Sequence, residues 1–105
     1  MQLIIDANPI ISILIKPGKV IDLLFIEELE LFAPELLFSE IENNKGIIIE
    51  KSGLTKEEIE EFIEILKNRI IIFTEEEFIS YIQSATEICP DEKDITYFAL
   101  ALYLK

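Results

Sequence analysis

The chain contains no histidine, no tryptophan and a single cysteine, Cys89. Without histidine it cannot build a Ser-His-Asp or Cys-His catalytic site, or a zinc site that uses histidine ligands. A lone cysteine cannot form an internal disulfide, which is typical of cytoplasmic proteins. Because no histidine is present to activate it, Cys89 is expected to be a small core residue rather than a nucleophile. The chemistry that remains is that of carboxylates with hard metal ions.

Basic residues are also scarce. Nine Lys and Arg stand against 21 Asp and Glu, which gives a formal net charge of −12. Nucleic acids and anionic membranes are bound by basic surfaces, so RNA would have to be reached through bound cations or a basic partner. No apolar run approaches the roughly 18 to 20 residues that a membrane span requires. We therefore expect a cytoplasmic protein with no membrane partner.

Half of the residues are hydrophobic, so the chain has enough apolar surface to fold. Its length predicts one domain, residues 1–105, with a single core. The abundance of Ile, Glu and Lys resembles the composition of proteins from thermophiles.

Apolar periodicity predicts an alternation of strands and helices. The expected strands cover residues 2–6, 30–33 and 70–73. The expected helices cover residues 9–15, 19–28, 34–44 with a continuation at 47–51, 56–68, 76–87 and 92–104. A strand followed by two helices, repeated three times, predicts an α/β fold of three layers, α/β/α, with a parallel sheet and helices on both faces.

Local signals mark several helix ends. Asn8 is expected to be the N-cap of the first helix, with Pro9 at its first helical position. Gly53 is expected to end the helix before it. Thr55 and Glu58 form the pattern of a capping box for the helix that follows.

Only four of the acidic residues are Asp, and Asp6 has the most informative position. It follows the apolar run of the first strand, at the carboxyl end where parallel α/β sheets bind their ligands. A carboxylate there is costly unless something compensates its charge. The alternative is a helix-capping role, which we rank lower because Asn8 already fits the cap position.

Glu40 stands out among the glutamates because of its place on its helix. A helix advances about 100° per residue, so Glu40 falls inside the arc occupied by Leu36, Leu37 and Ile41. Most glutamates here must be solvated surface residues, but one within an apolar stripe needs a partner. A functional role and a surface role for Glu40 are therefore equally open.

Asp91 and Asp94 open the last helix. Asp91 as N-cap with Asp94 three residues later would be a capping arrangement, favoured also by the helix dipole, and local sequence slightly prefers this explanation. The same spacing would also project two carboxylates toward a common point. Asp22 and the remaining glutamate runs are expected on the surface. Carboxylates that converge from separate elements are typical of Mg²⁺ and Mn²⁺ sites, which activate water for phosphodiester cleavage.

With these residues in place, the chain resembles the PIN-domain family, which includes VapC-type toxin ribonucleases and related archaeal nucleases. The likeness covers all 105 residues and rests on Leu3-Ile4-Ile5-Asp6-Ala7-Asn8, Ser39-Glu40-Ile41, and Asp91-Glu92-Lys93-Asp94 followed by Phe98-Ala99-Leu100-Ala101-Leu102. The resemblance implies RNA hydrolysis with Mg²⁺ or Mn²⁺ held by Asp6, Glu40 and Asp94. Asp91 would be a further catalytic residue. It also implies a dimer, and inhibition by a cognate antitoxin in many members.

One departure from the family pattern bears on activity. Members usually continue after the last helix into a further strand and a further acid, which have no counterpart after Lys105. That strand usually lies beside the first one, so we expect residues 2–6 to be an exposed sheet edge that drives self-association or partner binding.

Two other functions compete with the ribonuclease. One is a catalytically inactive PIN-like binding or regulatory protein, which the departure and the net charge both favour. The other is a receiver-like phospho-acceptor domain. It is disfavoured because a single acid, Asp6, follows the first strand and the third strand ends in Phe73-Thr74-Glu75.

Overall fold

A three-stranded parallel sheet organises the chain in the computed structural model, which describes residues 1–16, 22 and 24–105. The strands are β1 (Gln2–Ile4), β2 (Glu30–Pro34) and β3 (Ile70–Phe73), and they lie in the order β1-β2-β3. Leu3 pairs with Leu31, and Phe32 pairs with Ile71. The predicted α/β class and parallel sheet are confirmed, although β1 is shorter than expected.

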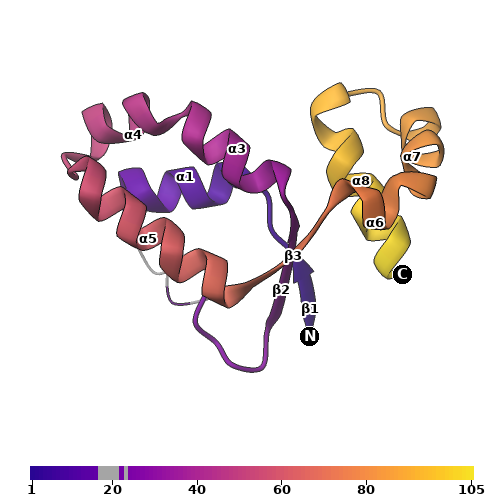
Figure 1. The fold of residues 1–105 in the computed structure, drawn as a ribbon, viewed down its shortest axis with the longest axis horizontal. Helices are drawn as coiled ribbons and strands as arrows, with labels where there is room; N and C mark the ends of the chain where they lie inside the picture. Colours follow the sequence, from indigo (N-terminus) through magenta and orange to yellow (C-terminus); the bar gives the residue numbers. More distant parts are fainter. Residues whose placement is uncertain (17–21, 23) are drawn as a thin grey trace.

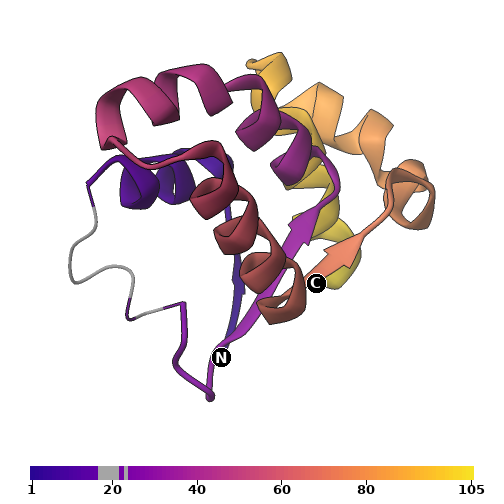
Figure 2. The ribbon, with the colours of Figure 1, turned by 60° about the vertical axis from the view of Figure 1, so that its left-hand side comes forward.

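The helices cover both faces of this sheet. They are α1 (Ala7–Ile15), α3 (Leu36–Asn43), α4 (Lys45–Ser52), α5 (Lys56–Arg69), α6 (Glu75–Phe78), the 3₁₀ turn η1 (Ile79–Tyr81), α7 (Ile82–Ile88) and α8 (Glu92–Leu104). Figure 1 shows α1, α3, α4 and α5 gathered on one side of the strands and α6, α7 and α8 on the other. In the turned view of Figure 2, α5 crosses in front of the strands and α8 lies behind them. The arrangement is the predicted α/β/α sandwich.

The alternation of side chains along the strands divides the apolar residues into two clusters. Leu31 and Ala33 of β2 point into a large cluster with α1, α3, α4 and α5. Phe32, between them, faces the other way and stacks edge-on against Phe73, with 5.7 Å between ring centroids. Phe73 packs in turn against a smaller cluster built around Phe78, Ala85, Ala99 and Leu100. Each face of the sheet therefore has its own core, in place of the single core that the length predicted.

Several predicted helix ends are confirmed. Thr55 and Glu58 make both bonds of the capping box, each 3.1 Å long. Gly53 ends α4 with a left-handed conformation, φ 76°, which favours glycine because it has no Cβ. The helix expected at 34–44 and its continuation at 47–51 are α3 and α4, separated at Asn44.

Of the helix expected at 19–28, only Asp22 is helical among the described residues. Residues 17–21 and 23 lie outside the described residues, and residues 24–28 form turns. The side chain of Arg69, at the end of α5, donates to the carbonyl oxygens of Ile26 and Leu29 at 2.6 and 2.9 Å. The prediction was therefore wrong for residues 24–28, and Arg69 gives the turn that replaces the helix a long-range hydrogen-bond partner.

The helix expected at 76–87 is broken into α6, η1 and α7. The backbone leaves helical geometry at Phe78, with φ −120° and ψ 18°. Phe78 is fully buried, and Tyr81 stacks against Tyr103 of α8 with 6.0 Å between ring centroids. Packing against α8 fixes these side chains, and the segment takes a short 3₁₀ turn to place them.

β1 lies at one edge of the sheet formed by the described residues, as predicted. Ile5 donates its N–H to Phe32 at 2.9 Å, and Met1 accepts from Glu30 at 2.8 Å. Because backbone groups alternate in direction along a strand, those of Gln2 and Ile4 point away from β2. Apolar hollows of about 290 and 250 Å³ flank this edge, one on the α1 side and one beside α8.

Candidate functional site

Asp6 follows β1 and serves as the N-cap of α1. Its backbone is extended, with φ −92° and ψ 159°, and its Oδ1 accepts the N–H of Asn8 at 3.2 Å. The prediction that Asn8 is the cap was therefore wrong, because the helix begins at Ala7. Asp and Asn are equally good caps, so propensity alone could not choose between them. What places the cap is the end of β1 together with the complete burial of Ala7.

Glu40 lies on α3 and is half-buried, between the fully buried Leu37 and Ile41. It has the partner that its place in the apolar stripe requires. The hydroxyl group of Tyr97, on α8, donates to Glu40 Oε1 at 2.8 Å. The sequence separation of this pair is 57 residues, so the bond ties the two helix layers together.

Asp91 and Asp94 lie at the start of α8, and both are exposed. Asp91 is the N-cap, and its Oδ1 accepts the N–H of Lys93 at 3.0 Å. Asp94 donates its backbone N–H to the Asp91 carbonyl at 3.0 Å. Among the described residues the Asp94 carboxylate makes no hydrogen bond, so only the side chain of Asp91 caps the helix. The local explanation is right for Asp91 and leaves the Asp94 side chain unassigned.

All four predicted acids line one cavity of about 590 Å³ beyond the carboxyl end of β1. They come from three separate elements: the β1–α1 junction, α3 and the start of α8. The remaining lining residues are Asn8, Leu36, Asn44, Lys93 and Tyr97. The location is the one that ligands occupy in parallel α/β folds.

The acids share this cavity without converging on a point. Within the described part of the chain, no three acidic side chains lie close enough to hold one metal ion. Mg²⁺ commonly binds through one or two carboxylates and keeps several water ligands. The oxygen donors therefore fit a hydrated hard cation, and a site with three carboxylates on one ion would require side chains to move.

One oxygen each of Asp6, Glu40 and Asp91 is already bonded to the protein. Such bonds orient a carboxylate and leave its second oxygen for another partner. Asp94 differs, because no hydrogen bond to either of its carboxylate oxygens is found among the described residues. Asp6, Asp91 and Asp94 are all exposed, so what distinguishes Asp94 is that its carboxylate is not oriented by a hydrogen bond to the described residues.

Tyr97 belongs to this cavity, although sequence reasoning missed it. Burial raises the pKa of its hydroxyl group far above the ordinary value. The hydrogen bond to Glu40 and the negative charges of Glu40 and Asp6 raise this pKa further, and a backbone hydrogen bond with Ala7 lowers it. Tyr97 follows Asp94 by three residues, which places both on one face of α8. That spacing was the available signal.

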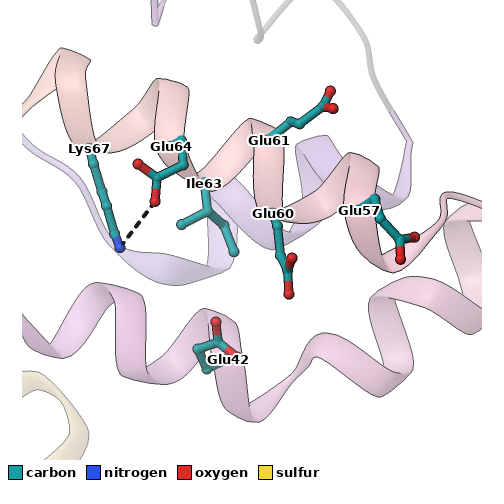
Figure 3. Close-up of a pocket in the computed structure, with 7 residues that line it drawn as sticks. All are labelled: Glu42, Glu57, Glu60, Glu61, Ile63, Glu64 and Lys67. Carbon is teal, nitrogen blue, oxygen red and sulfur yellow. Dashed lines mark hydrogen bonds and ion pairs between the residues drawn. The ribbon is translucent and has the colours of Figure 1, made fainter.

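A second cavity, of about 530 Å³, lies between α3 and α5 and is shown in Figure 3. Five glutamates, Ile63 and Lys67 line it, with Glu42 opposite the α5 side chains. Lys45 binds Glu42 and Glu60 at 3.0 and 3.4 Å, and Lys67 binds Glu64 at 3.5 Å. Three of the five glutamates are therefore in ion pairs, and Glu57, Glu60 and Glu61 are exposed, in agreement with the solvated helix faces expected there.

Comparison with known proteins gives one clear match. The PIN domain family model matches residues 4–105, a range that contains Asp6, Glu40, Asp91 and Asp94. No curated protein and no solved structure matches significantly. None of the described helices is both long enough and apolar enough to cross a membrane. The match spans most of the chain and agrees with its parallel α/β/α fold, so the chain belongs to the PIN domain family.

Proposed function

We propose that this protein is a ribonuclease that hydrolyses phosphodiester bonds of RNA with Mg²⁺ or Mn²⁺. Membership of the PIN domain family supports a nuclease-type function. The observation that carries the proposal is the gathering of four carboxylates from three distant segments in one cavity at the carboxyl end of β1. Oxygen donors of this kind suit hard divalent cations.

In the proposed mechanism Asp6, Glu40 and Asp94 would hold the cation, once their side chains move closer together. A bound cation would supply activated water and offset the charge of the phosphate. Asp6 and Glu40 are each oriented through one oxygen, and Asp94 can adjust because its carboxylate is unconstrained. Asp91 assists as a ligand or through a bridging water. Lys93 lines the same cavity and contributes a positive charge near the substrate.

The proposal extends to partners of the VapC type. We infer that the protein is a cytoplasmic toxin ribonuclease and that a cognate antitoxin inhibits it. A net charge of −12 favours a partner with a basic segment, because complementary charge speeds association and suppresses wrong partners.

We also infer self-association, as a homodimer or higher, through the edge of β1. Outward-pointing backbone groups of Gln2 and Ile4 offer hydrogen bonds to an added strand. Leu3 lines the hollow on the α1 side of this edge and is 47 % exposed. Phe98 lines the hollow beside α8 and is 46 % exposed. A second copy would cover both side chains.

Substitution of the site acids tests the ribonuclease. Asp6→Asn and Asp94→Asn are each expected to abolish Mn²⁺-dependent cleavage of single-stranded RNA, because they remove ligand charge with little change of shape. Glu57→Gln is the control, since it makes the same change of charge on α5. Cleavage is followed on labelled RNA with Mn²⁺ and with EDTA. Activity retained in either Asn variant would reject the site.

An inactive PIN-like binding or regulatory protein is the second candidate. The observation that favours it is that no three described acidic side chains converge closely enough to hold one ion. It predicts weak metal binding and no cleavage by the wild-type protein with any divalent ion, whereas the ribonuclease predicts cleavage that EDTA stops.

A further inference from the structure

The hydrogen bond between Tyr97 and Glu40 has an unusual place in this molecule. Among the described residues it is the only hydrogen bond between two side chains that connects the α1–α5 layer with the α6–α8 layer. The donor is the hydroxyl group of Tyr97 and the acceptor is Glu40 Oε1, at 2.8 Å. Both residues are partly buried, so water competes only weakly for either group.

The hydroxyl group of Tyr97 is surrounded by carboxylates of the candidate site. It lies in the cavity that Asp6, Glu40 and Asp94 line, and the negative charge of Asp6 acts on it as well as that of Glu40. A tyrosine hydroxyl has one proton to donate, and here it is committed to Glu40. A tyrosine hydroxyl group has an ordinary pKa of about 10, so the donor is present at physiological pH.

We propose that Tyr97 is a positioning residue, which holds Oε1 of Glu40 so that Oε2 would remain available to a divalent cation in the cavity that Asp6 and Asp94 also line. This inference rests on the proposed function. Carboxylates that bind metals are usually hydrogen-bonded themselves, and loss of such a bond typically lowers metal affinity about 10- to 100-fold. The bond also fixes α8 against α3, and hence Asp94 against Glu40.

Tyr97→Phe tests the proposal, because it removes the hydroxyl group and keeps the ring. We expect its affinity for Mn²⁺, measured by isothermal titration calorimetry, to fall at least about tenfold. The matched control is Tyr103→Phe on the same helix. Tyr103 stacks with Phe73 and Tyr81 and is not among the residues that line the cavity, so its Mn²⁺ affinity should stay at the wild-type value.

A double-mutant cycle separates positioning from general stabilisation. In a Glu40→Gln background the ligand charge is already lost, so adding Tyr97→Phe should change Mn²⁺ affinity less than twofold. A purely structural Tyr97 would lower the unfolding temperature in EDTA and leave wild-type Mn²⁺ affinity, which would overturn the proposal. An equal further loss of affinity in the Gln background would overturn it too.

The outcome for the proposed function can be read separately. If wild-type protein cleaves RNA and binds Mn²⁺ while Tyr97→Phe matches it in both, the positioning role is rejected and the ribonuclease stands. If wild-type protein neither binds Mn²⁺ nor cleaves RNA, the ribonuclease and the positioning role are rejected together.

Discussion

Asp6 shows how one residue can serve both the backbone and the site. Its Oδ1 caps α1 through Asn8, while its other oxygen is left for the cavity. A cap bond and a ligand bond need not compete, because a carboxylate has two oxygens and about four acceptor positions. The same division holds for Asp91 at the start of α8. Helix capping, which at first argued against a functional role, is compatible with one.

This double role predicts different effects for two substitutions of Asp6. Asp6→Asn should change the free energy of unfolding by no more than about 0.5 kcal/mol, because Asn caps helices as well as Asp does. Asp6→Ala should lower it by about 1 kcal/mol. Both variants should lose cleavage. Urea denaturation in EDTA measures the difference, and an equal loss of stability in both variants would show that the cap bond contributes nothing.

The residues of the site were predictable to different degrees. Asp6 and Glu40 could be chosen because strand ends and apolar stripes are visible in sequence, and both do line the cavity. Tyr97 was hidden, because its importance depends on a partner 57 residues away. Whether the carboxylates converge could not be predicted either, since it depends on side-chain torsions.

Among the elements, β1 has the greatest consequence for assembly. Its outward backbone groups belong to Gln2 and Ile4, while its inward bonds hold β2. Proline lacks the backbone N–H and is tolerated at sheet edges and strand starts. Gln2 is the first residue of β1, which is an edge strand of the sheet formed by the described residues.

Gln2→Pro should therefore block strand addition without breaking the β1–β2 pairing. At micromolar concentration and physiological salt, we expect sedimentation velocity to show dimers or larger species for the wild-type protein and monomers for this variant. Its unfolding temperature should be nearly unchanged. Leu3→Pro removes an inward N–H and should destabilise the fold instead. A wild-type protein that sediments only as a monomer contradicts self-association at this edge.

Element prediction succeeded where local signals dominate. The capping box at Thr55, the glycine at Gly53 and the β-branched run of β3 all act over a few residues, and their elements are present. It failed where distant side chains decide. Arg69 bonds the carbonyls of Ile26 and Leu29, and stacking of Tyr81 on Tyr103 accompanies the break in the helix expected at 76–87.

At the scale of the whole molecule, the charge of −12 determines how RNA would approach. Like charges repel beyond contact range, and salt screens this repulsion with a Debye length of about 10 Å at 0.1 M. At fixed Mn²⁺, association of RNA with the protein should therefore become faster between about 50 and 200 mM NaCl. Basic RNA-binding proteins behave in the opposite way.

Stopped-flow fluorescence with labelled single-stranded RNA measures this salt dependence. Glu57→Gln and Glu61→Gln together should weaken the effect, because they reduce the negative charge on α5, outside the cavity that the four site acids line. Association that slows steeply as salt rises would mean that a basic surface or a basic partner dominates binding.

The two cores on opposite faces of the sheet have a consequence for heat tolerance. Asp6 and Glu40 belong to segments that pack in the larger core. Asp94 and Tyr97 lie on α8, and Asp91 caps it, and α8 packs in the smaller core. Segments with fewer buried apolar contacts open locally at a lower free energy than the rest of a protein. On warming, α6 to α8 should unfold first while the sheet stays folded. Asp91, Asp94 and Tyr97 would then leave the cavity. Metal binding and the proposed cleavage would then be lost reversibly below the melting temperature. Cooling, which lets α8 pack on the sheet again, would restore them.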